Sequence, residues 1–333
     1  MTSWQSALFA KFARLNRLQP EGEMVGVADI CRQYDHLTGR LGTVIAGTRF
    51  EPAHIGQMRG EWTVPSRQDA GRLVLYFHGG GYVAGSPETH RPLVARLAAA
   101  AEARTFTLAY RHAPEHVFPA AVRDGLALYR QCLDRGVKPS SVALAGNGAG
   151  GGLAFSVLLA VRNAGLPMPA ALVAMSPWAD LTLSGWSILK NAGQDDVLSW
   201  ETLFVSARTY LNGANPADPY ASPLLASFKD FPPLMIHAGS REILRDDAAR
   251  LGEKAAEAGV PVSVEIYDGM PHLFQANTYA PEARVSIQRL GQFIRARMVA
   301  AAQGSVVQGV QQIAIPVPLV PVTAAHRVAG SPG

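Results

Sequence analysis

Cysteine is scarce in this chain. Cys31 and Cys132 are the only two among 333 residues, they lie far apart in the sequence, and neither belongs to a metal-ligand spacing. We therefore expect no cysteine-based metal site, and two ordinary thiols that are free or buried. A reducing compartment is consistent with such thiols, so we predict a cytoplasmic location.

A marked excess of charge of one sign is also absent. Lys and Arg total 30 against 26 Asp and Glu, and the basic residues are scattered through the chain. Because nucleic-acid binding proteins gather their basic residues into a patch or stripe, we expect no nucleic-acid partner.

Neither end of the chain has the pattern of a signal peptide or a membrane span. The first residues place Lys11, Arg14 and Arg17 after and among the apolar positions, which is unlike a signal peptide. Near the other end, "VVQGVQQIAIPVPLVPVTAA" is apolar, but its prolines would break a membrane helix. We predict that residues 302–333 form an extended or disordered tail.

Apolar residues are abundant, at 48% of the chain, so a large core can form. Short β-rich runs alternate with helical patterns, which predicts parallel strands joined by right-handed crossovers in a sheet covered on both faces. The predicted strands are 72–78, 104–110, 141–146, 171–176, 233–239 and 262–269, and the predicted helices lie near 90–102, 120–134, 149–164, 245–258 and 282–299. Trp4, Leu8, Phe12 and Leu15 recur at helical spacing and predict a further, amphipathic helix.

The glycine-rich stretch "SVALAGNGAGGG" (141–152) has two interpretations. Gly146, Gly148 and Gly151 fit the spacing of a dinucleotide fingerprint, whereas the same strand, turn and helix could form a nucleophile elbow with glycine in place of serine. The fingerprint requires an acidic residue at the end of the next strand, but "ALVAMS" ends without one and Asp180 comes late. A dinucleotide-binding protein is therefore a remote alternative.

Two further motifs follow predicted strands. Three consecutive glycines after His78 can bring backbone N–H groups close to a ligand, as an oxyanion hole requires, although a flexible loop would look the same. His272 follows the last strand, and an acid-rich loop, "GSREILRDD" (239–247), follows the strand before it. The chain order of elbow, acid and histidine is the order of the α/β-hydrolase architecture.

These motifs resemble those of the hormone-sensitive-lipase-like branch of α/β-hydrolases. The resemblance rests on "HGGG" (78–81), "YRHAPE" (110–115) and "GNGAGG" (146–151), and spans roughly residues 40–300. It implies an α/β fold with a mostly parallel central sheet, helices on both faces and a helical cap. Within the branch, the chain looks most like bacterial carboxylesterases and lactone hydrolases, which implies a small-molecule ester or lactone as partner and no cofactor.

The resemblance also implies a domain organisation and roles for individual residues. Residues 1–45 would belong to the cap, and 46–301 would form the core with a cap contribution from about 178–215. His272 would be the general base and Glu242 the acid that orients it, with Asp246 or Asp247 in reserve. The implied oxyanion donors are Gly79, Gly80 and Ala149, and the suggested pocket walls, for which core packing is the competing interpretation, are Tyr82, Asn147, Trp178, Met270 and Phe274.

The departure from the family pattern is at the elbow itself, where Gly148 occupies the position of the nucleophilic serine. Without a hydroxyl group, no acyl-enzyme can form by the family's route. Two hypotheses remain. The chain is either an ester hydrolase scaffold that is inactive or severely impaired, or a natural non-hydrolytic member that binds a small molecule or uses His272 for proton transfer. A homodimer is compatible with both.

Overall fold

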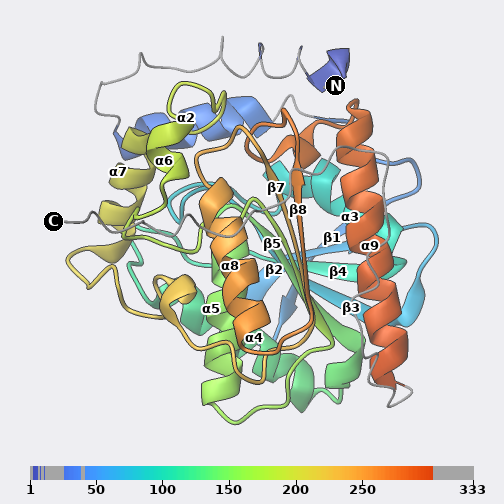
Figure 1. Cartoon of the computed structure of the whole chain (residues 1–333). Coiled ribbons are helices and arrows are strands. Elements are labelled where there is room, and N and C mark those ends of the chain that lie inside the picture. Colours follow the sequence, from blue (N-terminus) through green and yellow to red (C-terminus); the bar gives the residue numbers. More distant parts are fainter. Residues whose placement is uncertain (1–2, 7, 9–10, 12–25, 39–41, 303–333) are drawn as a thin grey trace, which may run out of the picture.

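The computed structural model describes residues 3–6, 8, 11, 26–38 and 42–302 (Figure 1). The strands are β1 (Arg49–Ile55), β2 (Met58–Val64), β3 (Asp69–Phe77), β4 (Ala103–Leu108), β5 (Val142–Asn147), β6 (Ala171–Met175), β7 (Leu234–Gly239) and β8 (Val262–Tyr267). The helices are α2 (Val27–Thr38), α3 (Arg91–Ala101), α4 (Ala120–Asp134), α5 (Ala149–Asn163), α6 (Ser187–Lys190), α7 (Trp200–Leu211), α8 (Arg245–Glu257) and α9 (Pro281–Ala302). The 3₁₀ turns are η1 (Glu88–His90), η2 (Pro139–Ser141), η3 (Pro223–Leu225) and η4 (Phe274–Ala276). The predicted tail beyond Ala302, and most of the helix predicted around Trp4 to Leu15, lie outside the described residues.

One eight-stranded sheet organises the described part of the chain, in the order β1-β2-β4-β3-β5-β6-β7-β8. β4, β3, β5, β6, β7 and β8 run parallel to one another. The pairs β1 with β2 and β2 with β4 are antiparallel. The six predicted strands and five predicted helices are confirmed, with ends that shift by three residues at most. β1 and β2 were not among the predicted strands. β1 contains Pro52 and is mostly exposed, as is typical of an edge strand, so it has no apolar run to reveal it.

Alternate side chains of each central strand pack into two separate hydrophobic cores, one on each face of the sheet. Leu75 and Phe77 of β3 pack into the core that includes α4 and α5, whereas Val74 and Tyr76 pack against α3 and α9. This period of two follows from the pleat of a strand. Because both faces are covered, the central strands are continuously apolar and buried, which is why their sequence reads as unbroken apolar runs.

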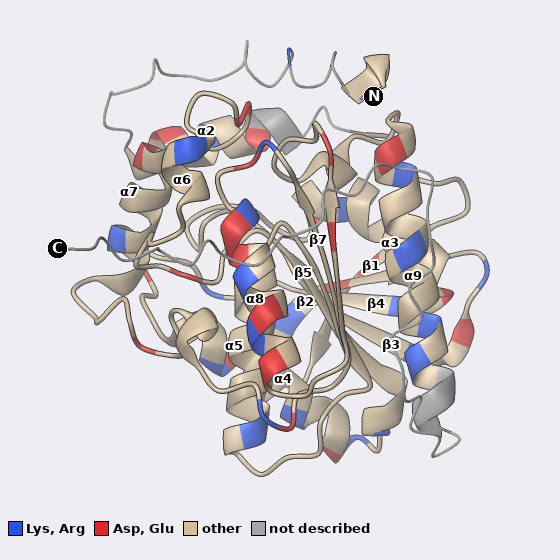
Figure 2. Ribbon diagram, viewed as in Figure 1, with Lys and Arg blue, Asp and Glu red and all other residues tan. Residues whose placement is uncertain are grey.

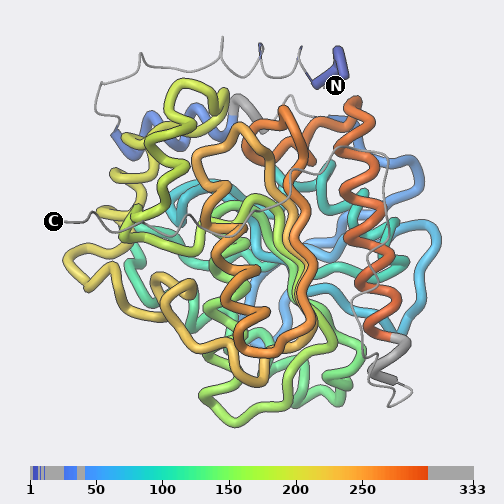
Figure 3. Tube along the Cα trace, in the orientation of Figure 1, coloured from blue at the N-terminus to red at the C-terminus, as the bar shows by residue number. Residues whose placement is uncertain are grey.

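Three helices gather beyond the carboxyl ends of the parallel strands. Figure 1 shows α2, α6 and α7 together at one end of the sheet, away from the layers formed by α3 with α9 and by α4, α5 and α8. The tube in Figure 3 shows that the blue segment of α2 lies beside the yellow-green segment of α6 and α7, and α2 packs against α7. Segments far apart in the sequence therefore meet over the sheet edge where ligands bind in such folds.

Charged residues of both signs are intermixed on α8, whereas those of α9 are mainly arginines, as Figure 2 shows. No helix in the described ranges is both long enough and apolar enough to span a membrane. Across the same residues, His, Cys, Asp and Glu side chains form no group of three or more that could hold a metal ion.

Candidate active site

The elbow is the tight turn between β5 and α5. Gly148 caps the amino end of α5 with φ 52° and ψ −124°, a backbone conformation that residues with a side chain rarely adopt. Its neighbours are glycines because the backbone packs closely there. A Cβ on Gly146 would lie 2.2 Å from the carbonyl oxygen of Gly150, and one on Gly152 would lie 1.8 Å from that of Trp178. The glycine spacing thus serves the packing of α5 against the sheet.

His272 and Glu242 form a buried pair. Glu242 follows β7, His272 follows β8, and Nδ1 of His272 lies 2.7 Å from Oε2 of Glu242. The other carboxylate oxygen accepts a 2.7 Å hydrogen bond from the N–H of Gly239. Burial raises the pKa of Glu242, and the hydrogen bond and charge of His272 oppose that shift. With Nδ1 engaged by the carboxylate, Nε2 is the ring nitrogen left to face the cavity.

The two reserve acids, Asp246 and Asp247, form hydrogen bonds with other parts of the chain. Asp246 accepts a 2.8 Å hydrogen bond from the N–H of Ser187 and thereby ties α8 to α6. Asp247 accepts from the N–H groups of Ala179 and Asp180 at 2.8 and 3.0 Å, and burial raises its pKa to about 8. Of the candidate carboxylates, Glu242 is the one that contacts His272.

The HGGG loop (78–81), called the oxyanion loop after its predicted role, differs from the prediction at one residue. The N–H of Gly79 donates to Oδ1 of Asn147 at 3.0 Å and to Nε2 of His90 at 3.2 Å, so it points away from the cavity. The assignment of Gly79 as a donor was therefore wrong. Among the described residues, the N–H groups of Gly80, Gly81 and Ala149 have no hydrogen-bond acceptor, and all three residues line the cavity. Gly81 was missed because three adjacent glycines carry no local sign of which N–H turns inward.

Glycine is required at this loop for two different reasons. Gly80 has φ 121°, and a Cβ there would lie 2.1 Å from the carbonyl oxygen of Ala84. Gly81 has φ 64°, and a Cβ there would lie 2.8 Å from Oγ of Ser206 on α7. The first contact is with backbone that cannot move aside, whereas the second is with a side chain of the neighbouring helix.

Buried polar side chains hold the loop from below. Oδ1 of Asn147 also accepts a 2.7 Å hydrogen bond from the hydroxyl of Tyr76, and Nε2 of His90 lies 2.8 Å from the hydroxyl of Tyr34 on α2. Burial lowers the pKa of His90 to about 4, so its ring is neutral at pH 7 and can accept these bonds. The loop is thus fixed to β5 on one side and to α2 on the other.

The "YRHAPE" motif supports the same loop. The hydroxyl of Tyr110 donates to the carbonyl oxygen of His78 at 2.8 Å, and the two rings stack with centroids 4.3 Å apart. The N–H of Ala113 donates to the carbonyl oxygen of Tyr82 at 3.0 Å. The motif therefore positions the HGGG segment and does not itself reach the cavity.

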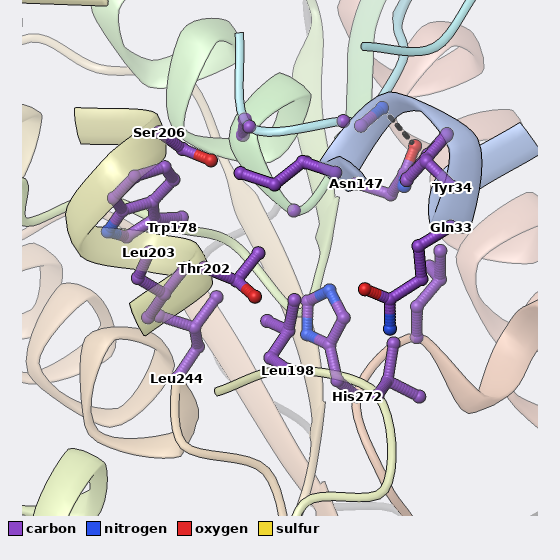
Figure 4. Close-up of a pocket in the computed structure, with 18 of the residues that line it drawn as sticks. Gln33, Tyr34, Asn147, Trp178, Leu198, Thr202, Leu203, Ser206, Leu244 and His272 are labelled. Atoms are coloured by element: carbon purple, nitrogen blue, oxygen red, sulfur yellow. Dashed lines mark hydrogen bonds between the residues drawn. The ribbon is translucent and has the colours of Figure 1, made fainter. Parts of the chain in front are cut away.

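A cavity of about 90 Å³ lies between the elbow, the oxyanion loop and His272. Figure 4 shows His272 between Thr202 on one side and Gln33 on the other in this view. Asn147 and Trp178 line it. The remaining walls come mainly from α2, from the segment 197–206 and from loops near the sheet edge, and they are Ile30, Gln33, Tyr34, Val197, Leu198, Thr202, Leu203, Ser206, Leu244, Leu273 and Ala276.

Three predicted wall residues do not line this cavity. Tyr82 is buried and stacks on Tyr210, with ring centroids 4.0 Å apart. Met270 and Phe274 are buried in a small cluster with Tyr267 on the far side of the His272 loop. For these residues core packing, the competing interpretation, holds. A signal for the missed wall existed in α2, where Val27, Ile30, Cys31 and Tyr34 recur at helical spacing.

The position of Gly148 within this arrangement determines what the site can do. A Cβ placed on Gly148 would lie 3.6 Å from Nε2 of His272 and 3.9 Å from Cα of Gly79. These are ordinary contact distances, so the site has room for a side chain that the sequence does not supply. The His272–Glu242 pair and the N–H groups of Gly80, Gly81 and Ala149 thus surround a position that carries no side chain.

A mostly parallel sheet with a strand-to-helix elbow, a late histidine paired with an acid, and backbone donors at one cavity define the α/β-hydrolase class of proteins. A family profile described as "alpha/beta hydrolase fold" matches residues 74–276. The chain belongs to the α/β-hydrolase family, in its hormone-sensitive-lipase-like branch.

Relatives with known names agree with this assignment. The chain is 44% identical to an acetyl-hydrolase of Streptomyces hygroscopicus over 242 residues, which cover 72% of this chain and 81% of the relative. It is 34% identical to an esterase of Acinetobacter venetianus over 74% of this chain and 81% of that protein. An esterase of the bacterial hormone-sensitive lipase family superposes with a TM-score of 0.85 at 37% identity, covering 90% of this chain and 99% of that one. The esterase EstE5, in crystals soaked with p-nitrophenyl butyrate, gives 0.84 at 38% identity, with 90% and 100% covered.

Proposed function

We propose that this chain is a carboxylic ester hydrolase of the hormone-sensitive-lipase type whose acyl-enzyme route is blocked at Gly148. The observation that carries the proposal is the placement of Gly148 at the elbow, with open space facing Nε2 of His272. The surrounding groups match what ester cleavage needs, and the missing group is the hydroxyl that would attack the carbonyl.

Each remaining group has a role in this proposal. His272 is the general base, and Glu242 holds its ring and favours the protonated imidazole that forms during reaction. Gly80, Gly81 and Ala149 offer N–H groups for the oxygen of the tetrahedral intermediate. With glycine at 148, an ester binds beside a base and an oxyanion hole, but its acyl group is not transferred to the protein.

The proposed ligand is a small carboxylic ester or lactone. Ile30, Leu198 and Leu203 contribute apolar walls, which suit a short acyl or alkyl group, while the backbone donors at one end suit a carbonyl oxygen. The similarity to an acetyl-hydrolase and to EstE5, which was soaked with p-nitrophenyl butyrate, supports this size of ligand. No cofactor enters the proposal.

The test is Gly148→Ser, measured beside the unaltered chain and Gly148→Ala on p-nitrophenyl butyrate. We expect the serine variant to exceed both by several orders of magnitude, because loss of the nucleophile in another serine hydrolase cost about 10⁶-fold in turnover. Gly148→Ala is the matched control, since it carries the same backbone strain without a hydroxyl.

A folded but inert Gly148→Ser variant would contradict the proposal. It would favour the alternative of a natural non-hydrolytic member, either a small-molecule binding protein or an enzyme that uses His272 for proton transfer. We also predict a cytoplasmic location, which cell fractionation would test. We predict a homodimer, which size-exclusion chromatography with light scattering would test.

A further inference from the structure

The space beside Gly148 lies open next to the ring of His272. The side chain missing from Gly148, relative to serine, is one carbon and one hydroxyl group. A Cβ would have no neighbour closer than 3.6 Å, and the neighbours at 3.6 and 3.8 Å are Nε2 and Cε1 of His272. The vacated space is therefore bounded by the nitrogen that would deprotonate a nucleophile.

The same space is continuous with the ligand cavity. Gly148, Ala149, Gly80, Gly81 and His272 all line the cavity of about 90 Å³. A small molecule entering the cavity can thus reach Nε2 without crossing the protein interior. Its oxygen, at a hydrogen-bond distance from Nε2, would stand near the place of a serine hydroxyl.

We propose that a small hydroxyl compound, either water or a one-carbon alcohol, occupies this space and attacks the bound ester directly, so that His272 drives acyl transfer in one stage without an acyl-enzyme. The proposal rests on the proposed function, since it assumes an ester in the cavity. The further activity is alcoholysis: an ester and methanol give a methyl ester and the released alcohol.

The proposed reaction of methanol with the ester is an ordinary acyl transfer. The oxygen of methanol forms a bond to the carbonyl carbon while Nε2 of His272 takes the hydroxyl proton. The carbonyl electron pair moves to oxygen, which the N–H groups of Gly80, Gly81 and Ala149 hold. The pair then returns, the bond to the leaving oxygen breaks, and Nε2 gives that oxygen the proton. With water in place of methanol, the product is the carboxylic acid.

Glu242 makes His272 suited to this step. Its carboxylate holds Nδ1 at 2.7 Å, which fixes the tautomer with a free electron pair on Nε2. A positioned general base contributes about 10²–10⁴-fold to a proton transfer of this kind. The attacking oxygen is not tethered, however, so the reaction forgoes the advantage of an intramolecular nucleophile and remains far slower than that of a serine enzyme.

The experiment uses the unaltered chain, p-nitrophenyl butyrate and increasing methanol, with methyl butyrate and butyric acid measured by gas chromatography. We expect methyl butyrate to form in proportion to methanol, about 10³-fold or more above a protein-free control. Mass spectrometry of protein quenched during turnover should show no acyl adduct. An acyl adduct on the unaltered chain would overturn the proposal.

Two variants locate the reaction. His272→Ala should lower the methanol-dependent rate by about 100-fold or more, because it removes the base. Gly148→Ala should lower it by about 10- to 100-fold, because its methyl group displaces the attacking oxygen. If Gly148→Ala does not fold, the unaltered chain is compared across methanol, ethanol and 2-propanol, and the enhancement over the protein-free rate should fall with alcohol size.

The outcomes separate this inference from the proposed function. Absence of protein-dependent methyl butyrate while Gly148→Ser cleaves the ester would overturn the inference alone. An inert but folded Gly148→Ser variant would count against the proposed function itself. A methyl butyrate rate that is unchanged in His272→Ala would show that His272 is not the base and would overturn the inference.

Discussion

The two halves of the candidate site differ in what they contribute to folding. On one half, formed by the loops after β7 and β8, His272 and Glu242 are buried and depend on each other for a hydrogen bond. On the other half, at the turn between β5 and α5, Gly148 has a backbone conformation that glycine adopts with little strain. The half with the buried polar pair, which is costly to bury, is complete. The half at Gly148 lacks a side chain, and that absence relieves backbone strain.

This difference teaches which changes the fold tolerates. Removing either member of a buried, hydrogen-bonded pair leaves the other without a partner, which destabilises the folded state. At the elbow, a glycine in place of a larger residue removes backbone strain, and Nε2 of His272 faces the cavity beside it. Glycine at the elbow therefore avoids backbone strain, whereas the loss of either Glu242 or His272 would destabilise the folded state.

We expect the largest effect on activity from removing His272 in the Gly148→Ser variant. In Gly148→Ser, the further change His272→Ala should lower the turnover of p-nitrophenyl butyrate by about 10⁶-fold, as for loss of the nucleophile itself, because the two act as a unit. Initial rates on purified, folded protein measure it. A double variant that keeps most of its activity would show that another group is the base.

The acid comes next. In the same background Glu242→Ala should cost about 10⁴-fold in turnover, since the histidine loses its orientation and its charge partner. Asp246→Ala is the matched control, because Asp246 bonds Ser187 and not His272, and its activity should stay within a few-fold of the parent. Comparable losses in both variants would mean that the effect comes from the shared loop and not from the carboxylate.

Acid should weaken both halves through buried histidines. His90 supports the oxyanion loop, and His237 lies on β7, the strand that Glu242 follows; burial lowers the pKa of each to about 4. The unfolded chain takes up these protons near pH 6.5, so the free energy of unfolding should fall as pH drops from about 6.5 to 4, by about 3 kcal/mol for each histidine. Urea unfolding at a series of pH values measures the loss.

Single variants separate the two histidines. His90→Gln and His237→Gln should each reduce the slope of unfolding free energy against pH by up to about 1.4 kcal/mol per pH unit within this window. The slope is informative even where the variant is less stable throughout. Slopes equal to that of the unaltered chain would show that neither histidine is neutral in the folded protein.

Restoring the serine should cost stability at the elbow. Gly148→Ser should lower the free energy of unfolding by about 1–3 kcal/mol, all of it from backbone strain, since the nearest atom to the new Cβ is 3.6 Å away. Gly165→Ser is the comparison, because Gly165 also has a positive φ, of 66°, and no atom within 4 Å of a Cβ. An elbow variant as stable as the unaltered chain would remove the contrast between the two halves.

The smallest expected effect concerns the support of the oxyanion loop. In the serine background, Asn147→Ala removes the acceptor shared by Gly79 and Tyr76 and should lower kcat by about fivefold to tenfold with little change in KM. Asn147→Asp keeps an acceptor at that place and should recover most of the loss. A change confined to KM would point to a role for Asn147 in ligand binding.

Much of the fold could be predicted from the sequence because its signals are local. Continuous apolar runs and helical periodicity located the six parallel strands and the five helices that cover them. The edge strand β1 escaped because an exposed strand that contains Pro52 has no such run. In the site, the order of elbow, acid and histidine placed Gly148, Glu242 and His272, since loops after parallel strands meet at one edge of the sheet.

The sequence by itself therefore determined the architecture, the elbow and the absence of its nucleophile. Tertiary packing set the direction of the N–H groups in the HGGG loop, because Asn147 and His90, from elsewhere in the chain, accept the N–H of Gly79, while those of Gly80 and Gly81 have no acceptor among the described residues. It also decided that α2 and α7 wall the cavity while Met270 does not. The physical reason is that periodicity and turn chemistry act between near neighbours in sequence, whereas the direction of a donor and the lining of a cavity depend on which distant segments pack against it.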